Sequence, residues 1–486
     1  EDDLGVEMEA EAVFLQRKRY FQGAHDLVLG VSHPVAMLCF MSFCNFLNYV
    51  DRGAIAGSMP AIADEFGLSN TQQGLVAAAF MLGYMVTAPF FGHMSRKVRP
   101  AVLMCVGLAA WTVAAVGTGL SFGYYSLLVV RTLIGVGEAS FVGLAPTYID
   151  DVSPIRWRSV WLGIFFSMIP IGAAVGYVIA GLFSATGLWE LSFFFEAMFM
   201  VPVAGMCYFI PEPHDVVVKA GWIPKAEPVA SAKEVSFFHS IYLLVTNLRY
   251  DLVVLGYAAV CFVTGALYFW APTYVVTELG VDIFRANLGI GVITVICGLF
   301  GTFIGGLLVD RLGGGEVVAT GLVVLFAALV FPLVLATFLV DNVVAFFALV
   351  TVGELMLFGV TAPINILCLS VVEQENRSFG ISLQIFMIHL LGDFPSPFIV
   401  GAISDMTNIR VAMVFSSMWM LYAIFFFALA LVAVTVHHRR HGGGIKATVV
   451  SEIDGEATVN MVEMGEANLA SESDLFSLSD DEEDTF

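Results

Sequence analysis

Hydrophobic and polar positions fall in long blocks along this chain. Twelve windows of about 20 apolar or small residues occur from residue 35 onward, and shorter polar intervals separate them. A helix of about 20 residues is long enough to cross the ~30 Å hydrocarbon core of a bilayer. The pattern therefore predicts an all-α membrane protein with twelve transmembrane helices. The expected spans are 35–58, 72–94, 100–120, 124–149, 159–183, 188–210, 251–278, 286–309, 316–340, 343–370, 379–403 and 409–436.

The longest polar interval inside the chain separates the sixth span from the seventh. It contains four prolines and scattered Lys and Glu residues, a composition typical of a linker. Six helices on either side of a linker is the layout of transporters built from internal repeats, which bind substrate near the bilayer midplane between the halves. We therefore expect an N-terminal tail (1–33), a first six-helix half (34–210), a linker (211–250), a second six-helix half (251–437) and a C-terminal tail (438–486).

Composition agrees with a membrane protein. Of the 486 residues, 58% are hydrophobic and 13% are charged, and the mean hydropathy is +0.86. The net charge of −21 comes largely from the tails, since six of the 42 acidic residues lie in 1–25 and twelve in 441–486. This acidity argues against nucleic acid as a partner.

Lys and Arg residues indicate the orientation, because cytosolic loops are enriched in them. Seventeen of the 21 lie in the tails, the linker and the loops on the same side, whereas only Arg285 and Arg410 lie on the other side. Both tails and the linker are therefore predicted to be cytosolic. The first span is expected to act as the insertion signal, because the residues before it do not resemble a cleaved signal peptide.

The C-terminal tail is expected to be disordered beyond the glycine run 442–444. It is poor in aromatic residues and ends in S-E-S-D-L-F-S-L-S-D-D-E-E-D followed by two residues. Its serines in an acidic context could be phosphorylated or bound by sorting adaptors. The alternative is that the tail only keeps this end of the protein solvated.

Three expected spans of the first half carry charged residues in their apolar interior. Asp51 and Arg52 lie in the first, Arg131 and Glu138 in the fourth, and Glu196, with no predicted partner, in the sixth. A charge at a helix centre costs roughly 2.5–3.5 kcal/mol on insertion scales, so such residues usually face a protein interior or a water-filled cavity. Residues 131 and 138 are seven apart and share a helix face, whereas 51 and 52 point about 100° apart and cannot face one partner equally. A pore or carrier is therefore the first function to consider.

Short motifs at the ends of spans resemble the loop signature of the major facilitator superfamily. The second-half string G-G-L-L-V-D-R-L-G (305–313) matches it, which makes Asp310 and Arg311 candidates for a latch that changes partner between states. The first-half counterpart (91–100) departs from the pattern at its Gly-Asp position. The fifth span has a glycine spacing typical of close helix approach, at positions 163, 172, 176 and 181.

Five further strings resemble one branch of that superfamily, the Spinster family. They are N-Y-V-D-R (48–52), R-T-L-I-G-V-G-E-A-S (131–140), F-V-T-G-A-L-Y-F-W-A-P (262–272), G-E-L (353–355) and L-Q-I-F-M-I-H-L-L-G-D-F-P-S-P (383–397). The resemblance covers about residues 40–430. It implies the major facilitator fold, a carrier working by alternating access, and a cargo of the lysophospholipid or sphingolipid type, including sphingosine-1-phosphate.

In the superfamily layout the first and fourth spans are adjacent and line the central cavity. The resemblance therefore implies that Asp51, Arg52, Arg131 and Glu138 form one cluster. A purely structural ion network is the alternative, although buried ion pairs are poor stabilisers because desolvation offsets much of their attraction. A carboxylate beside an arginine also suits proton coupling, because the acid stays ionised while the arginine is close and can bind a proton when it leaves. We expect Asp51 to be the proton acceptor, Arg52 or Arg131 its partner, and Glu138 a residue that tunes the site.

The second half offers candidates for gating or substrate contact. His389 and Asp393 are four residues apart in span eleven and share a helix face. The resemblance implies that they act as a pair in gating or in the pH response, with a plain helix–helix hydrogen bond as the alternative. Glu354 in span ten is a further candidate. Tyr268 and Trp270 in span seven could line a cavity opened by a helix break at the following proline, or could simply pack.

The predicted function is secondary transport of lysophospholipid or sphingolipid coupled to protons, without a cofactor. A proton-coupled carrier of small organic anions or sugars is the alternative within transport, and a receptor or scaffold that works through its tail is the alternative outside it. An enzyme is least expected, because no metal-ligand spacing, Walker-type glycine loop or nucleophile elbow is found outside the helices. The acidic tail and the resemblance favour an endosomal or lysosomal membrane and leave the plasma membrane open.

Overall fold

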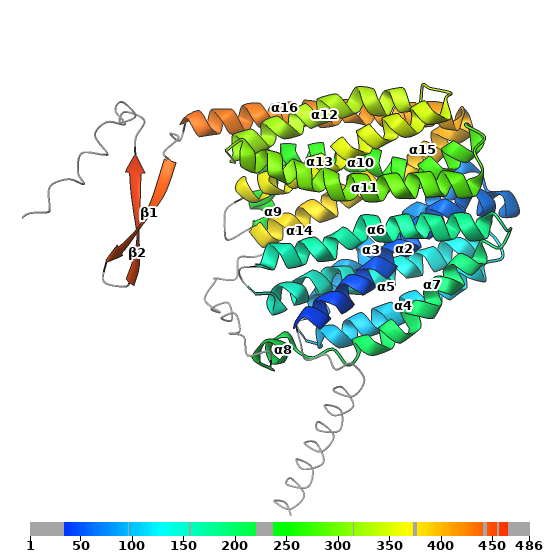
Figure 1. Cartoon of the computed structure of the whole chain (residues 1–486), viewed down its shortest axis with the longest axis horizontal. Coiled ribbons are helices and arrows are strands. Elements are labelled where there is room, and N and C mark those ends of the chain that lie inside the picture. The colour runs from blue at the N-terminus through cyan, green and yellow to red at the C-terminus, as the bar shows by residue number, and fades with distance from the viewer. Residues whose placement is uncertain are drawn as a thin grey trace, which may run out of the picture.

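The protein is a bundle of long, nearly parallel helices (Figure 1). The computed structural model describes residues 34–95, 97–154, 157–219, 237–313, 315–372, 377–440, 445–453 and 456–464. The bundle consists of α2 (Pro34–Phe66), α3 (Asn70–Met94), α4 (Pro100–Gly119), α5 (Tyr124–Val152), α6 (Arg158–Ser184), α7 (Glu190–Cys207), α10 (Leu248–Thr277), α11 (Ile283–Arg311), α12 (Glu316–Thr337), α13 (Val343–Ser370), α14 (Arg377–Ile388), η3 (His389–Asp393), α15 (Pro395–Met406) and α16 (Ile409–Arg440). The short segments α14, η3 and α15 follow one another in the place of a single span.

The helices confirm the prediction of an all-α membrane protein. In the described part of the chain, eleven are long and apolar enough to cross a bilayer, counting α14 to α15 as one. The twelfth is α2, which is 33 residues long and carries buried Asn45, Asn48 and Asp51 in its interior. Large apolar side chains cover the outside of the bundle, including Val113 and Phe303, which are 73% and 68% exposed. A surface of this kind suits lipid rather than water.

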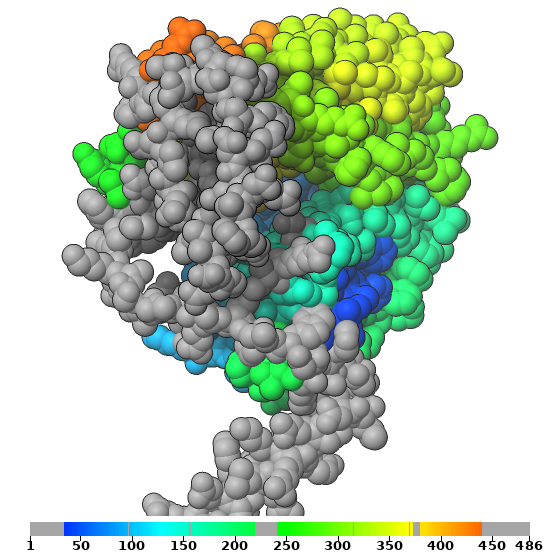
Figure 2. Space-filling view, turned by 60° about the vertical axis from the view of Figure 1, so that its left-hand side comes forward, coloured from blue at the N-terminus to red at the C-terminus, as the bar shows by residue number. Residues whose placement is uncertain are grey.

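The helices pack in two groups. In the first, α2 lies against α6, and α5 lies against α3 and α4; in the second, α13 lies against α11 and α12, and α10 against α16. The groups meet where α6 packs on α11, α3 on α15 and α2 on α10. We call the side at which α2 begins and α16 ends the tail side, and the opposite side the loop side. In the view turned toward the tail side, the green-to-orange second group lies above the blue-to-teal first group, and the two meet on the right (Figure 2).

Small residues let the backbones of α2 and α6 touch. A Cβ atom added to Gly53 would lie 2.0 Å from the carbonyl oxygen of Ala173, and one added to Gly176 would lie 2.2 Å from that of Val50. Close backbone approach of this kind is how membrane helices gain packing energy without a hydrophobic driving force. The predicted glycine face of α6 holds at positions 172, 176 and 181, but no described atom lies within 4 Å of a Cβ at Gly163, where the expectation was wrong.

On the loop side, polar contacts tie the two groups together. Asp405 at the end of α15 accepts hydrogen bonds from the backbone N–H groups of Asn70 (2.8 Å) and Thr71 (2.8 Å) and from the Thr71 hydroxyl (2.5 Å). Both N–H groups belong to the first turn of α3, where a carboxylate is favoured by the helix dipole. Asn287 of α11 donates to the carbonyl oxygen of Gly57 in α2 (3.1 Å). These bonds close the loop side of the interface between the groups.

Two regions outside the bundle contain secondary structure. The interval 211–250 contains two short helices, α8 (Pro213–Lys219) and α9 (Phe237–Val245), and residues 220–236 lie outside the described residues. The tail was predicted to be disordered, but β1 (Ile445–Ile453) and β2 (Glu456–Met464) pair as an antiparallel hairpin. The reason lies in the β-branched and apolar residues of I-K-A-T-V-V-S-E-I and E-A-T-V-N-M-V-E-M, which favour strands. The serine-rich end of the tail lies outside the described residues.

Candidate functional site

A bidentate ion pair joins α2 to α5 inside the first group. The two terminal nitrogens of Arg131 donate to the two carboxylate oxygens of Asp51 at 2.8 and 2.7 Å. Both side chains are buried, at 2% and 0% exposure. The planar guanidinium matches a carboxylate in this fork geometry, which is the strongest form of charge-assisted hydrogen bond. The pair is therefore well ordered and shielded from solvent.

A second ion pair lies beside it. Arg52 donates to Oε1 of Glu138 at 2.6 Å, so each arginine pairs with a carboxylate on the other helix. The guanidinium of Arg52 lies 4.7 Å from the ring centre of Tyr49 and 4.6 Å from that of Phe80. Such contacts favour a cation in a site from which water is largely excluded. Arg52 keeps 16% exposure while Glu138 has none, so this pair is the more accessible of the two.

Helix geometry explains the alternation of the two pairs. Residues 131 and 138 share a face of α5, as their spacing predicted, and residues 51 and 52 point in different directions on α2. The two adjacent residues of α2 therefore reach different partners on α5: Asp51 pairs with Arg131, and Arg52 pairs with Glu138. The four candidate residues thus lie in one cluster. Their roles in transport stay predictions.

The cluster has unused hydrogen-bonding capacity. Among the described residues, Oε2 of Glu138 and the Nε atoms of Arg52 and Arg131 are buried without a partner. The side-chain nitrogen and oxygen of Asn48, one turn before Arg52 on α2, are also buried without a partner. Buried polar groups are nearly always bonded, so unpartnered ones point to a site that a ligand, a proton or water completes.

In the second group, His389 and Asp393 lie at the two ends of a π-helical turn. Nδ1 of His389 lies 2.8 Å from Oδ2 of Asp393, and both side chains are about one-fifth exposed, at 19% and 22%. The Tyr84 ring of α3 meets the His389 ring edge to face at 5.8 Å, so the pair lies at the interface between the groups. Phe394 donates to the carbonyl oxygen of His389, five residues back (2.9 Å), and the next residue, Pro395, has no N–H to donate. Turns of this kind are frequent at functional sites.

The other candidates of the second group differ in placement. Glu354 of α13 is buried, and its Oε2 has no partner among the described residues. Tyr268 is half-buried, and its carbonyl oxygen accepts a 2.5 Å hydrogen bond from the Tyr177 hydroxyl of α6, which links the two groups. The Tyr268 hydroxyl itself is buried and unpartnered in the described part of the chain. Tyr268 therefore remains a candidate for substrate contact.

Of the two alternatives for Trp270, lining a cavity or packing, the structure shows packing. Its side chain is fully buried, and its indole N–H donates to the carbonyl oxygen of Pro397 in α15 at 3.0 Å. It therefore anchors α10 to α15. The expected break at Pro272 is absent as well, because α10 continues through it to Thr277. Neighbouring helices commonly make up for a proline within a membrane bundle.

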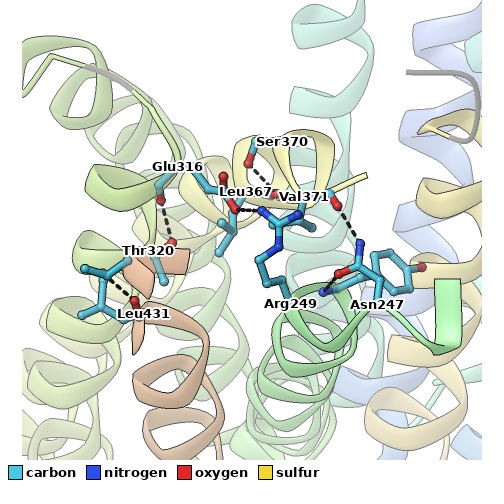
Figure 3. Close-up of polar contacts among 10 residues, drawn as sticks. Asn247, Arg249, Glu316, Thr320, Leu367, Ser370, Val371 and Leu431 are labelled. Atoms are coloured by element: carbon cyan, nitrogen blue, oxygen red, sulfur yellow. Dashed lines mark hydrogen bonds and ion pairs between the residues drawn. The ribbon is translucent and has the colours of Figure 1, made fainter. Parts of the chain in front are cut away.

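The predicted latch residues are exposed at the tail-side end of α11. Within the described residues, neither Asp310 nor Arg311 makes an ion pair. The tail side of the second group is held instead by Arg249 of α10, which donates to Glu316 of α12 at 3.1 Å. Asn247 bonds the carbonyl oxygen of Val371, just after α13, at 2.8 Å (Figure 3). The latch role stays a prediction.

Comparison with known proteins places the chain in a family. The model of the Major Facilitator Superfamily matches residues 41–397. A probable sphingolipid transporter, spinster homolog 2 of Arabidopsis thaliana, is 33% identical over 409 residues, which cover 77% of this chain and 82% of that protein. Protein spinster homolog 1 of Homo sapiens is 32% identical over 400 residues, which cover 76% of this chain and 72% of that protein. The chain belongs to the Spinster family of the Major Facilitator Superfamily.

A solved structure agrees with the fold of this Spinster protein. The crystal structure of a bacterial homologue of the human lysosomal transporter Spinster, inward-facing and unoccupied, superposes with a TM-score of 0.73. It is 18% identical, and the match covers 83% of this chain and 98% of that one. The predicted major facilitator architecture is therefore confirmed. The family match and the relatives make the chain a transporter of the Spinster type.

Some residues of the Spinster site were not identified from sequence. Tyr49 lies inside N-Y-V-D-R, yet nothing in that string indicates that it and Phe80 enclose Arg52. Asp405 lies near the end of an expected span, where acidic residues are common. The sequence therefore gives no indication that it bonds to α3. Glu196 was noted as intramembrane, and it proves to be 1% exposed.

Proposed function

We propose that this protein moves a lysophospholipid or sphingolipid across a membrane by alternating access, coupled to protons. The observation that carries the proposal is the adjacent placement of a sealed pair, Asp51–Arg131, and a partly accessible pair, Arg52–Glu138. The first suits a proton switch and the second suits recognition of a charged head group. The relatives support the cargo class, since one of them is a probable sphingolipid transporter.

Arg52 is the residue best suited to contact the head group. A guanidinium binds phosphate in the same forked geometry as carboxylate, so a lipid phosphate would compete with Glu138 for it. Arg52 is the more exposed of the two arginines, and its Nε donor is free among the described residues. Glu138 would tune the site by holding Arg52 in place until cargo arrives.

Asp51 is the proposed proton acceptor. While Arg131 holds both of its oxygens, the carboxylate is compensated and has no need of a proton. If Arg131 moves away, Asp51 becomes a buried charge without a partner, which is strongly unfavourable. Binding a proton then neutralises it. Proton binding and the movement of α2 against α5 are therefore coupled.

Location and orientation follow from charge and from a relative. The bias of Lys and Arg residues supports cytosolic tails. The bacterial neighbour is a homologue of a human lysosomal transporter, and a lysosomal or endosomal membrane supplies a proton gradient. Each pH unit of that gradient supplies ~1.4 kcal/mol per proton, which supports about tenfold accumulation of a neutral or zwitterionic cargo moved one for one.

The proposal is tested by uptake into proteoliposomes with and without a pH gradient. Radiolabelled lysophosphatidylcholine and sphingosine-1-phosphate are supplied to wild type, Asp51→Asn and the control Glu212→Gln, whose carboxylate is exposed and paired at the surface. We expect the gradient to stimulate uptake by wild type and the control but not by Asp51→Asn. Uptake of neither lipid by folded protein would rule out the cargo class and direct attention to small organic anions. Full gradient stimulation in Asp51→Asn would rule out the proton role.

A further inference from the structure

Glu196 is a buried carboxyl group without a partner. It lies in the middle of α7 at 1% exposure, and neither of its oxygens has a hydrogen-bond partner in the part of the chain that the structure describes. The hydroxyl of Ser192, one turn earlier on α7, is likewise buried and unpartnered. An ionised carboxylate in such a position is unstable, so Glu196 must either carry a proton or find a cation.

The surroundings of Glu196 on the outer side of the bundle cannot supply that cation. Glu196 borders a hollow of about 170 Å³ between α2, α6 and α7. All other residues that line the hollow are apolar, four of them phenylalanines and four of them aliphatic residues. Phe43, Phe195 and Phe199 among them are about two-fifths exposed on the bundle surface, where lipid would lie. This side therefore offers Glu196 neither charge nor hydrogen bonds.

The charged groups near Glu196 lie on its inner side. Asp51 on α2 and Arg131 and Glu138 on α5 all interact with it electrostatically. The third helix packed on α7 is α4, whose residues Pro100–Gly119 include no charged side chain, and α6 contributes Val175 and Ile179 to the hollow. Glu196 thus stands between an apolar hollow and the ion-pair cluster.

A count of charges shows what the cluster lacks. In this part of the first group the described residues provide three buried carboxyl groups, those of Asp51, Glu138 and Glu196. They provide two guanidinium groups, that of the buried Arg131 and that of the mostly buried Arg52. Each guanidinium already pairs with one of the first two acids. One carboxyl group is left over, and a proton is the counter-charge that fits Glu196, whose side chain is almost completely buried. In this conformation that proton belongs on Glu196.

We propose that Glu196 is a second proton-binding residue and that it exchanges its proton with Asp51. Here Arg131 pairs with Asp51 while Glu196 is the neutral acid. If Arg131 turns to Glu196, the O–H bond of Glu196 breaks, its carboxylate takes over the guanidinium, and an oxygen of Asp51 accepts the proton. The net charge of the cluster is unchanged throughout. The inference rests on the proposed proton-coupled transport for its purpose, although the protonation of Glu196 stands without it.

Arg131 has the means for this exchange. Both of its terminal nitrogens are used by Asp51, but its Nε–H donor is buried and unpartnered among the described residues. A single guanidinium can compensate only one carboxylate fully, so the ionisation of Glu196 and the release of Asp51 are linked. Glu196 would thereby determine when Asp51 is free to bind a proton.

Infrared spectroscopy of purified protein tests the protonation directly. A protonated carboxyl group in apolar surroundings has a carbonyl stretching band that ionised carboxylates lack. The buried Glu354 can contribute to the same band, so the test is the component that depends on Glu196. At neutral pH we expect wild type to show a component of the band that is lost in Glu196→Gln and in Glu196→Met, two variants of similar size that guard against a folding failure in either. Asp51→Asn and Glu190→Gln should retain it; Glu190 lies on the same helix but is only half-buried at its start. An unchanged band in both folded Glu196 variants would overturn the inference.

Uptake measurements on the same samples separate the inference from the transport proposal. If Glu196 exchanges its proton with Asp51, Glu196→Gln should keep lysolipid uptake without a gradient and lose its stimulation by a pH gradient. Full stimulation in this variant would overturn the exchange. Wild type could show a band that depends on Glu196 and yet take up neither lipid. That result would support Glu196 as a proton-binding residue and rule out the proposed cargo.

Discussion

At the scale of residues, the site depends on which acid meets which base. Sequence spacing was sufficient to place Arg131 and Glu138 on one face of a helix and to separate Asp51 from Arg52. It was not sufficient to predict the partner of Asp51, which could have been Arg52 on its own helix or Arg131 on the facing one. The choice depends on the rotation of α2 against α5, which is set by contacts such as that of Gly53 with Ala173, distant in sequence.

Removal of Arg131 should separate a structural from a functional role of the pair. Arg131→Met leaves Asp51 buried and uncompensated, which should lower stability by about 3–5 kcal/mol, seen as a lower melting temperature in detergent. Adding Asp51→Leu should restore much of that stability, because an apolar pair of similar volume is often neutral or stabilising. We expect the double variant to show no gradient-stimulated uptake. If gradient-stimulated uptake returned with stability, the pair would be structural only.

At the scale of elements, apolar periodicity predicted that the helices exist, but it predicted their ends and local irregularities less well. The predicted spans correspond to the bundle helices, but α2 continues to Phe66, beyond its expected end at residue 58. The π-helical turn at His389 was missed because it depends on the hydrogen-bond shift before Pro395, for which apolar periodicity carries no signal. The hairpin of the tail was missed because composition was weighed above the β-branched residues of two short segments.

Contact between α2 and α6 can be tested with two glycines. Gly53→Ala should destabilise the protein by about 1–3 kcal/mol or more, since its Cβ would lie 2.0 Å from a backbone oxygen that cannot move alone. The control Gly163→Ala on α6 places its Cβ where no described atom lies within 4 Å, and alanine favours the helix. Melting temperatures in detergent compare the two. Equal effects would contradict the close approach of the helices.

The bond between α15 and α3 should hold the loop side closed. Asp405→Asn replaces a charged acceptor of three hydrogen bonds, and hydrogen bonds to charged groups contribute about 1.5–3 kcal/mol each. The variant should therefore shift the population toward a state open on the loop side. Distances between spin labels on α3 and α15 measure this shift, with Asp64→Asn, an exposed acid on α2, as the control. An unchanged distance distribution would show that Asp405 does not stabilise the closure.

At the scale of the whole molecule, two six-helix groups that meet at α2, α3, α6, α10, α11 and α15 form a transporter of the Spinster type. Length, hydropathy and five short strings were enough to predict this architecture, because each span must cross the same bilayer. The conformation could not be predicted, since a carrier uses one sequence for several states. Contacts such as those of Asp405 and Asn287 distinguish the state seen here, closed on the loop side.

The tail should be dispensable for transport. A chain ending at Arg440 retains every bundle helix, so its lipid uptake in proteoliposomes should match that of the full chain. Any role of the acidic serines in sorting would then appear as a changed location in cells, measured by microscopy of the two forms. A truncated protein that folds but takes up no lipid would instead favour a function carried by the tail.

The account depends most on the claim that lipid and protons move together through the cluster around Asp51. A pH-sensitive dye inside proteoliposomes, read while lysophosphatidylcholine or sphingosine-1-phosphate is added, tests this directly. We expect lipid addition to drive proton movement in wild type and in Glu212→Gln, and to drive none in Asp51→Asn. Lipid uptake by wild type without any proton movement would contradict the account.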